Sequence, residues 1–261
     1  MSLKLAAYNL GACDDAIAAL QACVSEAIAF DDASVEIRAR VGLGVVFGDA
    51  GRFDVAQYEF LRALQLAERH PDTAGPARIT ANIANLHRKR AQAHFAAGFE
   101  ARGLHECDTS ARVAGRACRM AVEEGNVAAE IDALAIRGCA YDLRGEAEHA
   151  RALLKASIAL GRSSRCPTAI VWVLCELGRL CLAADDLGGA RTAFVEALDL
   201  ARELRPSRKI AVACAGLADV EAREGRVPAA LGWWERAADE AAAFEIASLQ
   251  TRRQISEFFA V

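Results

Sequence analysis

Residues 43–64 read LGVVFGDAGRFDVAQYEFLRAL, and this stretch decides the fold class. A large residue, a small residue and an aromatic residue come first, followed by a turn glycine and a second series at helical spacing. The order is carried by Leu43, Gly44, Phe47, Gly51, Phe53, Ala56, Phe60, Ala63 and Leu64. Small residues let a bulky side chain of a neighbouring helix approach closely. The stretch predicts two antiparallel helices joined at Gly51, where a left-handed backbone ends the first helix.

The same order of residue types recurs three times downstream. The copies are Leu134, Gly138, Tyr141, Gly145, Ala150, Leu154 and Ile158; Leu174, Leu177, Gly178, Cys181, Leu187, Ala190, Phe194, Ala197 and Leu198; and Leu217, Ala218, Gly225, Val227, Ala230, Trp234 and Ala237. Ala150, Ala190 and Ala230 stand 40 residues apart. Gly145, Asp185 and Gly225 occupy the turn position. A regular period of this length predicts a stack of helical hairpins.

This series resembles the tetratricopeptide repeat (TPR), a helix-turn-helix unit, and its longer period is similar to the TPR-like arrays of bacterial signalling regulators. The resemblance implies an all-α, right-handed α-solenoid of about six helical hairpins, the first incomplete, with a C-terminal capping helix. We expect one superhelical domain over 1–261. Its expected repeats are 1–36 (partial), 37–77, 78–130 (divergent), 131–170, 171–210 and 211–244, followed by the capping helix 245–261.

Composition narrows the class of partner. Lys and Arg number 31 against 35 Asp and Glu, so the net charge of −4 provides no global cationic field for nucleic acid or anionic lipid. No apolar run approaches the roughly 20 residues that span a bilayer, and the opening residues do not resemble a secretion signal. We therefore expect a cytoplasmic protein that contacts neither nucleic acid nor membrane.

The cysteines and histidines are interpreted as structural. Nine cysteines without a Cys-x-x-Cys pair predict reduced, small core residues, including Cys139, Cys175, Cys181 and Cys214 on first helices. A thiolate nucleophile would need a neighbouring base and is the less favoured alternative. His87, His94 and His105 lack metal-ligand spacing, so we expect no metal. The glycines of GLGVVFG (42–48) are assigned to repeat packing and not to a dinucleotide loop, because no strand precedes them.

The charged motifs also have local explanations. The Asp pairs at 14–15, 31–32 and 185–186 are expected near turns and helix starts, where an aspartate caps a helix. The run Arg88, Lys89 and Arg90 is interpreted as a solvated helix face, with contact to an anion or an acidic peptide as the alternative.

The TPR resemblance implies that first helices line a concave surface that meets the ligand. The residues that it places there are Arg38, Asp49, Asn85, Arg88, Gln92, Asp132, Trp172, Glu176, Arg179 and Asp219. Trp172 is the strongest candidate, because an indole beside Glu176 and Arg179 suits an interface anchor. Burial of this indole between repeats is the competing interpretation.

The predicted solenoid suits a scaffold that binds a protein or peptide, and the resemblance to TPR-like arrays implies that it is the sensory or regulatory part of a bacterial signalling system. We expect no catalysis and no cofactor, because each candidate constellation has a packing explanation. The alternative is a regulator gated by a small molecule or a signal peptide. Self-association through an open end of the array is a further option.

Overall fold

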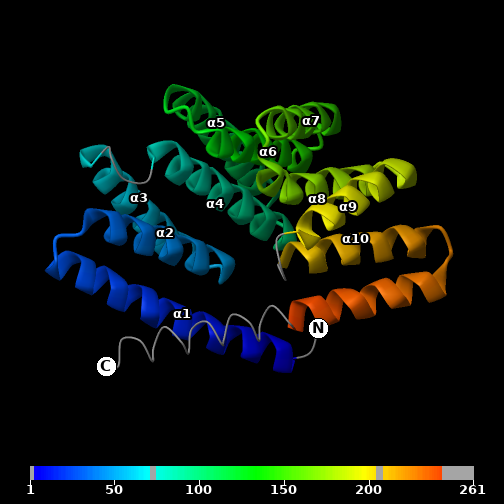
Figure 1. Ribbon diagram of the computed structural model, residues 1–261, viewed down its shortest axis with the longest axis horizontal. Coiled ribbons are helices and arrows are strands. Elements are labelled where there is room, and N and C mark those ends of the chain that lie inside the picture. The colour runs from blue at the N-terminus through cyan, green and yellow to red at the C-terminus, as the bar shows by residue number, and fades with distance from the viewer. Residues whose placement is uncertain (1–2, 71–74, 204–207, 243–261) are drawn as a thin grey trace. The chain divides into compact units, whose positions relative to one another are not determined.

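The protein is helical throughout the residues that the computed structural model describes, which are 3–70, 75–203 and 208–242. The helices are α1 (Leu3–Ala29), α2 (Ala33–Asp49), α3 (Phe53–Arg69), α4 (Pro76–Ala96), α5 (Glu100–Glu123), α6 (Val127–Leu143), α7 (Ala147–Ser163), α8 (Pro167–Ala183), α9 (Leu187–Arg202) and α10 (Arg208–Arg223), and a further helix runs through 227–242 (Figure 1). No strand occurs in these three ranges, so the all-α prediction is confirmed.

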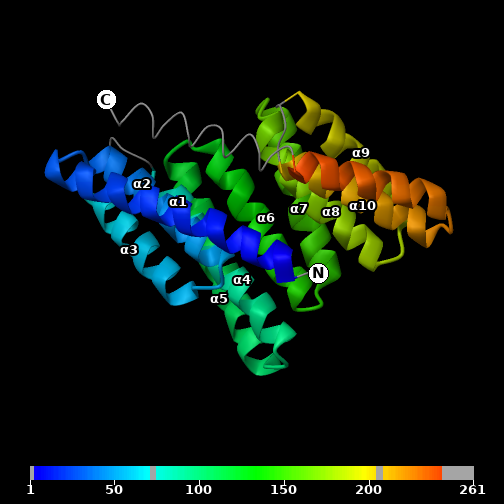
Figure 2. The same cartoon turned by 90° about the horizontal axis from the view of Figure 1, so that it is seen from below.

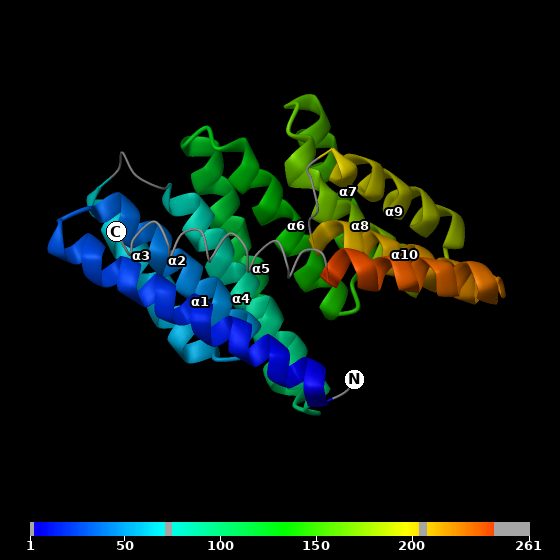
Figure 3. The same ribbon diagram turned by 60° about the horizontal axis from the view of Figure 1, so that its bottom comes forward.

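Packing divides the chain into two compact units, and the division falls within α7. Unit 1 comprises residues 1–153, where α1 lies along α2, α2 packs on α3, and α4 contacts both α5 and α6 (Figure 2). Unit 2 comprises residues 154–261, where α9 packs against both α8 and α10 (Figure 3). First helices begin a few residues before the expected repeat limits. The single domain and those limits stay predictions, and the expected capping helix 245–261 lies outside the described residues.

The predicted contact between a small residue and an aromatic ring is confirmed in both units. A carbon placed on Gly44 of α2 would lie 2.6 Å from the ring of Phe60 on α3, and one on Gly178 of α8 would lie 2.7 Å from Phe194 on α9. Both phenylalanines are buried. The missing side chain therefore lets the second helix of each pair approach the first.

The turns within the helix pairs are also confirmed. Gly51, Gly145 and Gly225 adopt φ values of +74°, +82° and +77°, and Asp185 adopts +59° at the equivalent place in α8–α9. Glycine reaches this left-handed region without the steric cost of a side chain, and aspartate tolerates it better than most residues.

Two of the three Asp pairs divide a single task between their members. Asp31 and Asp185 take the left-handed conformation, and each following aspartate caps the next helix. Asp32 accepts a hydrogen bond from the backbone N–H of Val35 at 2.9 Å, and Asp186 accepts one from Gly189 at 2.8 Å. The expectation for the pair at 14–15 is wrong, because both residues lie inside the unbroken helix α1.

Candidate functional site

The predicted ligand-binding face is clearest on α8 in unit 2. Trp172, Glu176 and Arg179 recur at spacings of four and three residues, which places them on one side of the helix. Trp172 and Glu176 are half-buried, and Arg179 is exposed and donates a hydrogen bond from Nε to Glu176 Oε2 at 3.1 Å. Most of the other residues of α8 between Ile170 and Leu182 are buried in the core. The indole therefore lies at the margin of the core with part of its surface open.

Two hydrogen bonds fix the register of α10 beside α8. Lys209 Nζ donates to the carbonyl oxygen of Thr168 at 3.3 Å, and an Arg223 guanidinium N–H donates to that of Leu182 at 2.7 Å. Each bond joins residues 41 positions apart in the sequence. The two first helices therefore run in the same direction and are aligned over most of their length.

This register extends the α8 face onto α10. Val212 and Asp219 lie close to the levels of Trp172 and Arg179, and both are exposed. The neighbouring first helices thus present an apolar level and a charged level side by side. That combination provides both contact area and hydrogen-bonding groups for a ligand that crosses the two helices.

In unit 1 the predicted residues lie on three first helices. They are Arg38 and Asp49 on α2, Asn85, Arg88 and Gln92 on α4, and Asp132 on α6. Arg88 Nε donates to Asn85 Oδ1 at 2.9 Å, and Asp49 forms an ion pair with Lys89. The structure therefore brings Asn85 and Arg88 together, whereas Asp49 is engaged by the neighbouring helix.

The three consecutive cations of α4 point in different directions. Side chains of adjacent helical residues are separated by about 100° around the axis. Accordingly, Arg88 bonds within its own helix, Lys89 reaches α2, and Arg90 reaches α3 and α5. All three are half-buried, so their interpretation as a solvated helix face is wrong. They form separate contacts rather than one cationic patch.

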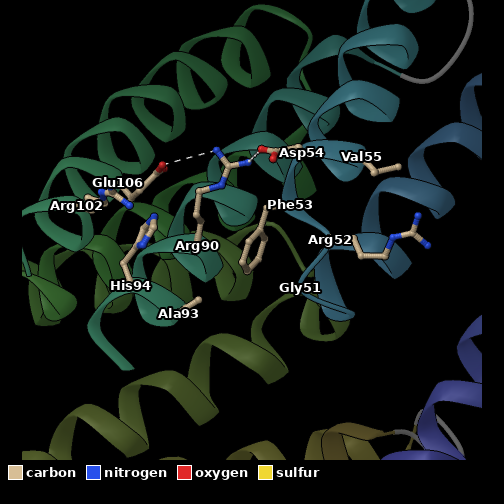
Figure 4. A pocket seen from close by; sticks show the side chains of 10 residues that line it. All are labelled: Gly51, Arg52, Phe53, Asp54, Val55, Arg90, Ala93, His94, Arg102 and Glu106. Atoms are coloured by element: carbon tan, nitrogen blue, oxygen red, sulfur yellow. Dashed lines mark hydrogen bonds and ion pairs between the residues drawn. The ribbon is translucent and has the colours of Figure 1, made fainter. Parts of the chain in front are cut away.

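A groove of about 580 Å³ opens in unit 1 between the α2–α3 turn, the second half of α4 and the start of α5 (Figure 4). It is lined by Gly51, Arg52, Phe53, Asp54, Val55, Arg90, Ala93, His94, Arg102 and Glu106. None of the ten residues predicted for the first-helix face lines this groove. It lies instead where the turns of two successive helix pairs meet.

A chain of charged contacts crosses this groove. Arg90 donates a hydrogen bond to Asp54 Oδ1 at 2.8 Å, and a second nitrogen of its guanidinium lies 3.7 Å from Glu106 Oε1. Glu106 is also in contact with His87, whose Nδ1 lies 2.6 Å from Glu106 Oε2. Two carboxylates therefore compensate the charge of Arg90 and hold its side chain across the groove (Figure 4).

The four first-helix cysteines are buried, as predicted: Cys139, Cys175, Cys181 and Cys214. Burial raises the pKa of Cys175 to about 12, and it raises the pKa of Cys107 on α5 to about 11. A thiol of such high pKa is almost wholly protonated at neutral pH. These two cysteines therefore have a packing role in the core.

The histidines of α4 likewise have structural neighbours. His87 is held by Glu106, and the His94 ring meets the edge of Phe99 at a centroid distance of 6.2 Å. Within the described ranges, no group of three or more His, Cys, Asp or Glu side chains is arranged to hold a metal ion. None of the helices in those ranges is sufficiently long and apolar to traverse a bilayer.

No protein-family model and no curated protein sequence matches the chain. Solved structures do share its helix arrangement. A Rap protein complexed with competence and sporulation factor matches with a TM-score of 0.63 and 16% identity, over 81% of this chain and 55% of the Rap chain. The chain has a tetratricopeptide-like fold. The predicted fold class is thereby confirmed.

Two further structures share this TPR-like fold. NprR in complex with its cognate peptide NprX matches with a TM-score of 0.60 and 14% identity, over 98% of this chain and 75% of that one. BtubC (BKLC) from P. vanneervenii matches with a TM-score of 0.57 and 17% identity, over 90% and 92% of the two chains. Helix arrangement is thus retained at low sequence identity, because the fold depends on where small and large residues fall.

The TPR-like framework did not predict the groove, although the sequence contains a signal for it. A turn glycine followed closely by phenylalanine and arginine occurs in GRF (51–53) and again in GFEAR (98–102). These two turns belong to successive helix pairs and supply Arg52, Phe53 and Arg102. Reading the turns as possible binding elements, and not only as connections, would have found these residues.

Proposed function

We propose that the chain is a non-catalytic regulatory module that binds a peptide or a protein segment through its first helices. The row of Trp172, Glu176 and Arg179 on α8 is the observation that carries this proposal. The TPR-like fold that the chain shares with a Rap protein and with NprR, both solved in complex with a peptide or factor, supports it. The module belongs in the cytoplasm, where free thiols persist.

The chemistry of the α8 face suits an extended ligand. A half-buried indole offers apolar contact area with little loss of side-chain freedom, and Glu176 and Arg179 supply an acceptor and donors beside it. Asp219 extends the face on α10. A face built on packed helices is ordered before the ligand arrives, so association loses less conformational entropy.

The first helices of unit 1 carry a candidate face of their own. Its members are Arg38, Asp49, Asn85, Arg88, Gln92 and Asp132. The amide and guanidinium of Asn85 and Arg88 hold each other at 2.9 Å and would present donors to the backbone carbonyls of a peptide. We assign Trp172 the largest share of the affinity, because aromatic anchors dominate most binding interfaces.

A selected peptide tests the proposal. Random peptides displayed on phage are selected against the protein, and the affinity of a labelled winner is measured by fluorescence anisotropy. Trp172→Ala should weaken this affinity by about 30-fold or more, as expected for a central anchor, and should change the melting temperature little. Arg202→Gln, on the exposed surface of α9, is the matched control. Unchanged affinity, or a large fall in melting temperature, contradicts the proposal.

The same protein distinguishes the small-molecule alternative. The chain has three tryptophans, and replacing Trp233 and Trp234 with phenylalanine leaves Trp172 as the single emitter. Titration with a panel of metabolites should then leave the emission of Trp172 unchanged, whereas the selected peptide should shift it. Saturable quenching by one metabolite would favour a regulator gated by a small molecule.

A further inference from the structure

We propose that the groove between the α2–α3 turn, α4 and α5 is a second binding site, for a linear acidic peptide with an apolar side chain between two carboxylates. The groove lies entirely in unit 1 and shares no residue with the first-helix face. This inference therefore does not depend on the function proposed above.

Two arginines at the groove have guanidinium groups that are positioned but not neutralised. Arg52 lies over the ring of Phe47 with its guanidinium carbon 4.5 Å from the ring centroid, and Arg102 lies over Phe99 at 5.3 Å. Both arginines are exposed, and neither forms an ion pair with a carboxylate of the described residues. A ring against one face of a guanidinium holds the group while its N–H donors stay available for a ligand.

Arg90 lies between these two arginines and, unlike them, is already paired with carboxylates of the protein. It is bound to Asp54 and Glu106 on the two sides of the groove, and its guanidinium carbon also lies 5.7 Å from the Phe53 ring. Its donors are therefore engaged within the protein. The positive charge left for a ligand is that of Arg52 and Arg102, one on each side of Arg90 (Figure 4).

Part of the lining of the groove is apolar. Phe53, Val55 and Ala93 line the groove, and Phe99 beside Arg102 is 52% exposed although it is a large hydrophobic residue. An exposed phenylalanine at the rim of a groove is available to cover an apolar side chain of a ligand. The volume of about 580 Å³ falls within the usual range for ligand pockets, roughly 300–1,000 Å³.

This arrangement matches an acidic peptide better than other anions. Each guanidinium can receive one carboxylate through two parallel N–H bonds, and the apolar part of the lining can receive the intervening side chain. A nucleic acid would extend its phosphates beyond the groove over a protein with a net charge of −4, whereas a short peptide would meet mainly the groove itself, where the carboxylates of Asp54 and Glu106 are already bound to Arg90. The positive charge of Arg52 and Arg102 is thus confined to the groove, while the protein as a whole is negatively charged. A short acidic segment fits this distribution better than a long polyanion does.

A synthetic peptide tests the site. The probe is a fluorescein-labelled peptide, blocked at both ends, with one leucine flanked on each side by two glutamates, and its affinity is measured by anisotropy at low ionic strength. Arg52→Gln and Arg102→Gln should each weaken binding about tenfold, as expected for loss of a charge-assisted pair, and added NaCl should weaken it further. Arg112→Gln, which removes the same charge from the exposed surface of α5, is the matched control and should leave binding unchanged.

Several controls make the result specific to this site. A peptide with glutamines in place of the glutamates should bind at least tenfold more weakly. The double variant R52E/R102E should lose the acidic peptide and gain a peptide with lysines in those positions, which would exclude misfolding as the cause. Trp172→Ala should leave this binding intact, so the two proposals can fail separately. Equal affinity for the glutamine peptide, no effect of the double variant, or preferred binding of a single-stranded oligonucleotide would overturn the proposal.

Discussion

Units 1 and 2 use the same packing within a helix pair but join successive pairs differently. In unit 1 the neighbouring pairs are connected by side-chain ion pairs, Lys89 to Asp49 and Arg90 to Asp54. In unit 2 the ion pair of Arg191 with Glu221 likewise connects α9 to α10, and Lys209 and Arg223 of α10 in addition donate hydrogen bonds to backbone carbonyls of α8. One packing rule therefore fixes the pair, and the contacts between pairs are set separately.

The aromatic residue at the centre of each pair shows the same difference. Phe60 of α3 faces Gly44 and belongs to a core with large neighbours such as Ile37 and Leu43. Phe194 of α9 faces Gly178 on α8 and also contacts Gly216 on α10, so one ring packs against two first helices. An ion pair could not replace this contact, because the ring packs in place only where the backbones of three helices approach closely.

Removing these rings should give the largest effect. Phe60→Ala and Phe194→Ala should each lower the free energy of unfolding by about 3–5 kcal/mol. Phe194→Ala should lie at the upper end of this range, because the glycines around its ring have no side chains that could fill the cavity. The measurement is urea unfolding followed by far-UV circular dichroism, with tryptophan fluorescence reporting on unit 2, which contains all three tryptophans. Phe30→Ala, at an 83% exposed position, is the control and should change stability by less than about 0.5 kcal/mol. A larger cost at Phe60 would contradict the proposed difference between the units.

Replacing a helical glycine with alanine should change stability by an intermediate amount. The sign of the change should depend on whether a buried ring faces the glycine. Gly44→Ala and Gly178→Ala should destabilise by about 1–3 kcal/mol, because the new carbon meets a buried ring. Gly115→Ala, inside α5 with open space around it, should stabilise by about 0.5–1 kcal/mol through its better helix propensity. Urea midpoints of the three variants check this prediction. Stabilisation at Gly44 or Gly178 would show that the rings yield readily.

The smallest expected effect concerns a charged cluster of unit 2. Glu221 of α10 is only 8% exposed at its side chain, and hydrogen bonds from Arg226 and then Arg191 lower its pKa below the ordinary glutamate value of 4.5. The folded state therefore favours the carboxylate, so its stabilising contribution is present above about pH 4.5 and is lost as the pH falls through the lowered pKa.

Glu221→Gln should accordingly lower the stability of unit 2 by about 1 kcal/mol at pH 7 and reduce its loss of stability between about pH 5 and pH 3. Tryptophan-detected urea unfolding across this range measures both quantities. Asp199→Asn, an exposed acid of α9, is the matched control and should leave the pH profile unchanged. A variant with the same acid sensitivity as the parent protein would show that the cluster is not a source of it.

Unit 1 contains the reverse arrangement, a nearly buried arginine that lies between two glutamates. Arg40 donates to Glu36 at 2.7 Å and to Glu59 at 2.8 Å, and all three side chains are nearly buried. Burial opposes the charge of Arg40, but the bonds and charges of the two glutamates outweigh it and raise its pKa. Unit 1 therefore holds a cation between two acids inside a pair, whereas unit 2 holds an acid, Glu221, between two cations where pairs meet.

Sequence alone determined the hairpins and their internal contacts. Gly51, Gly145 and Gly225 end first helices, and Gly44 and Gly178 admit a ring, because each depends on residues close in sequence or at a repeated spacing. Asp185 could be placed in the same way. These signals act over one or two helical turns or repeat every 40 residues, so a pattern of residue types is sufficient to find them.

Only the tertiary structure decided which side chains meet between elements. It separated Arg88, Lys89 and Arg90 onto different neighbours, placed Asp14 and Asp15 in the middle of α1 and not at a helix end, and brought Arg52 and Arg102 to one groove. The physical reason is that such contacts depend on helix length and on the register between helices. A shift of one residue rotates a side chain by about 100°, which is enough to exchange a partner for solvent.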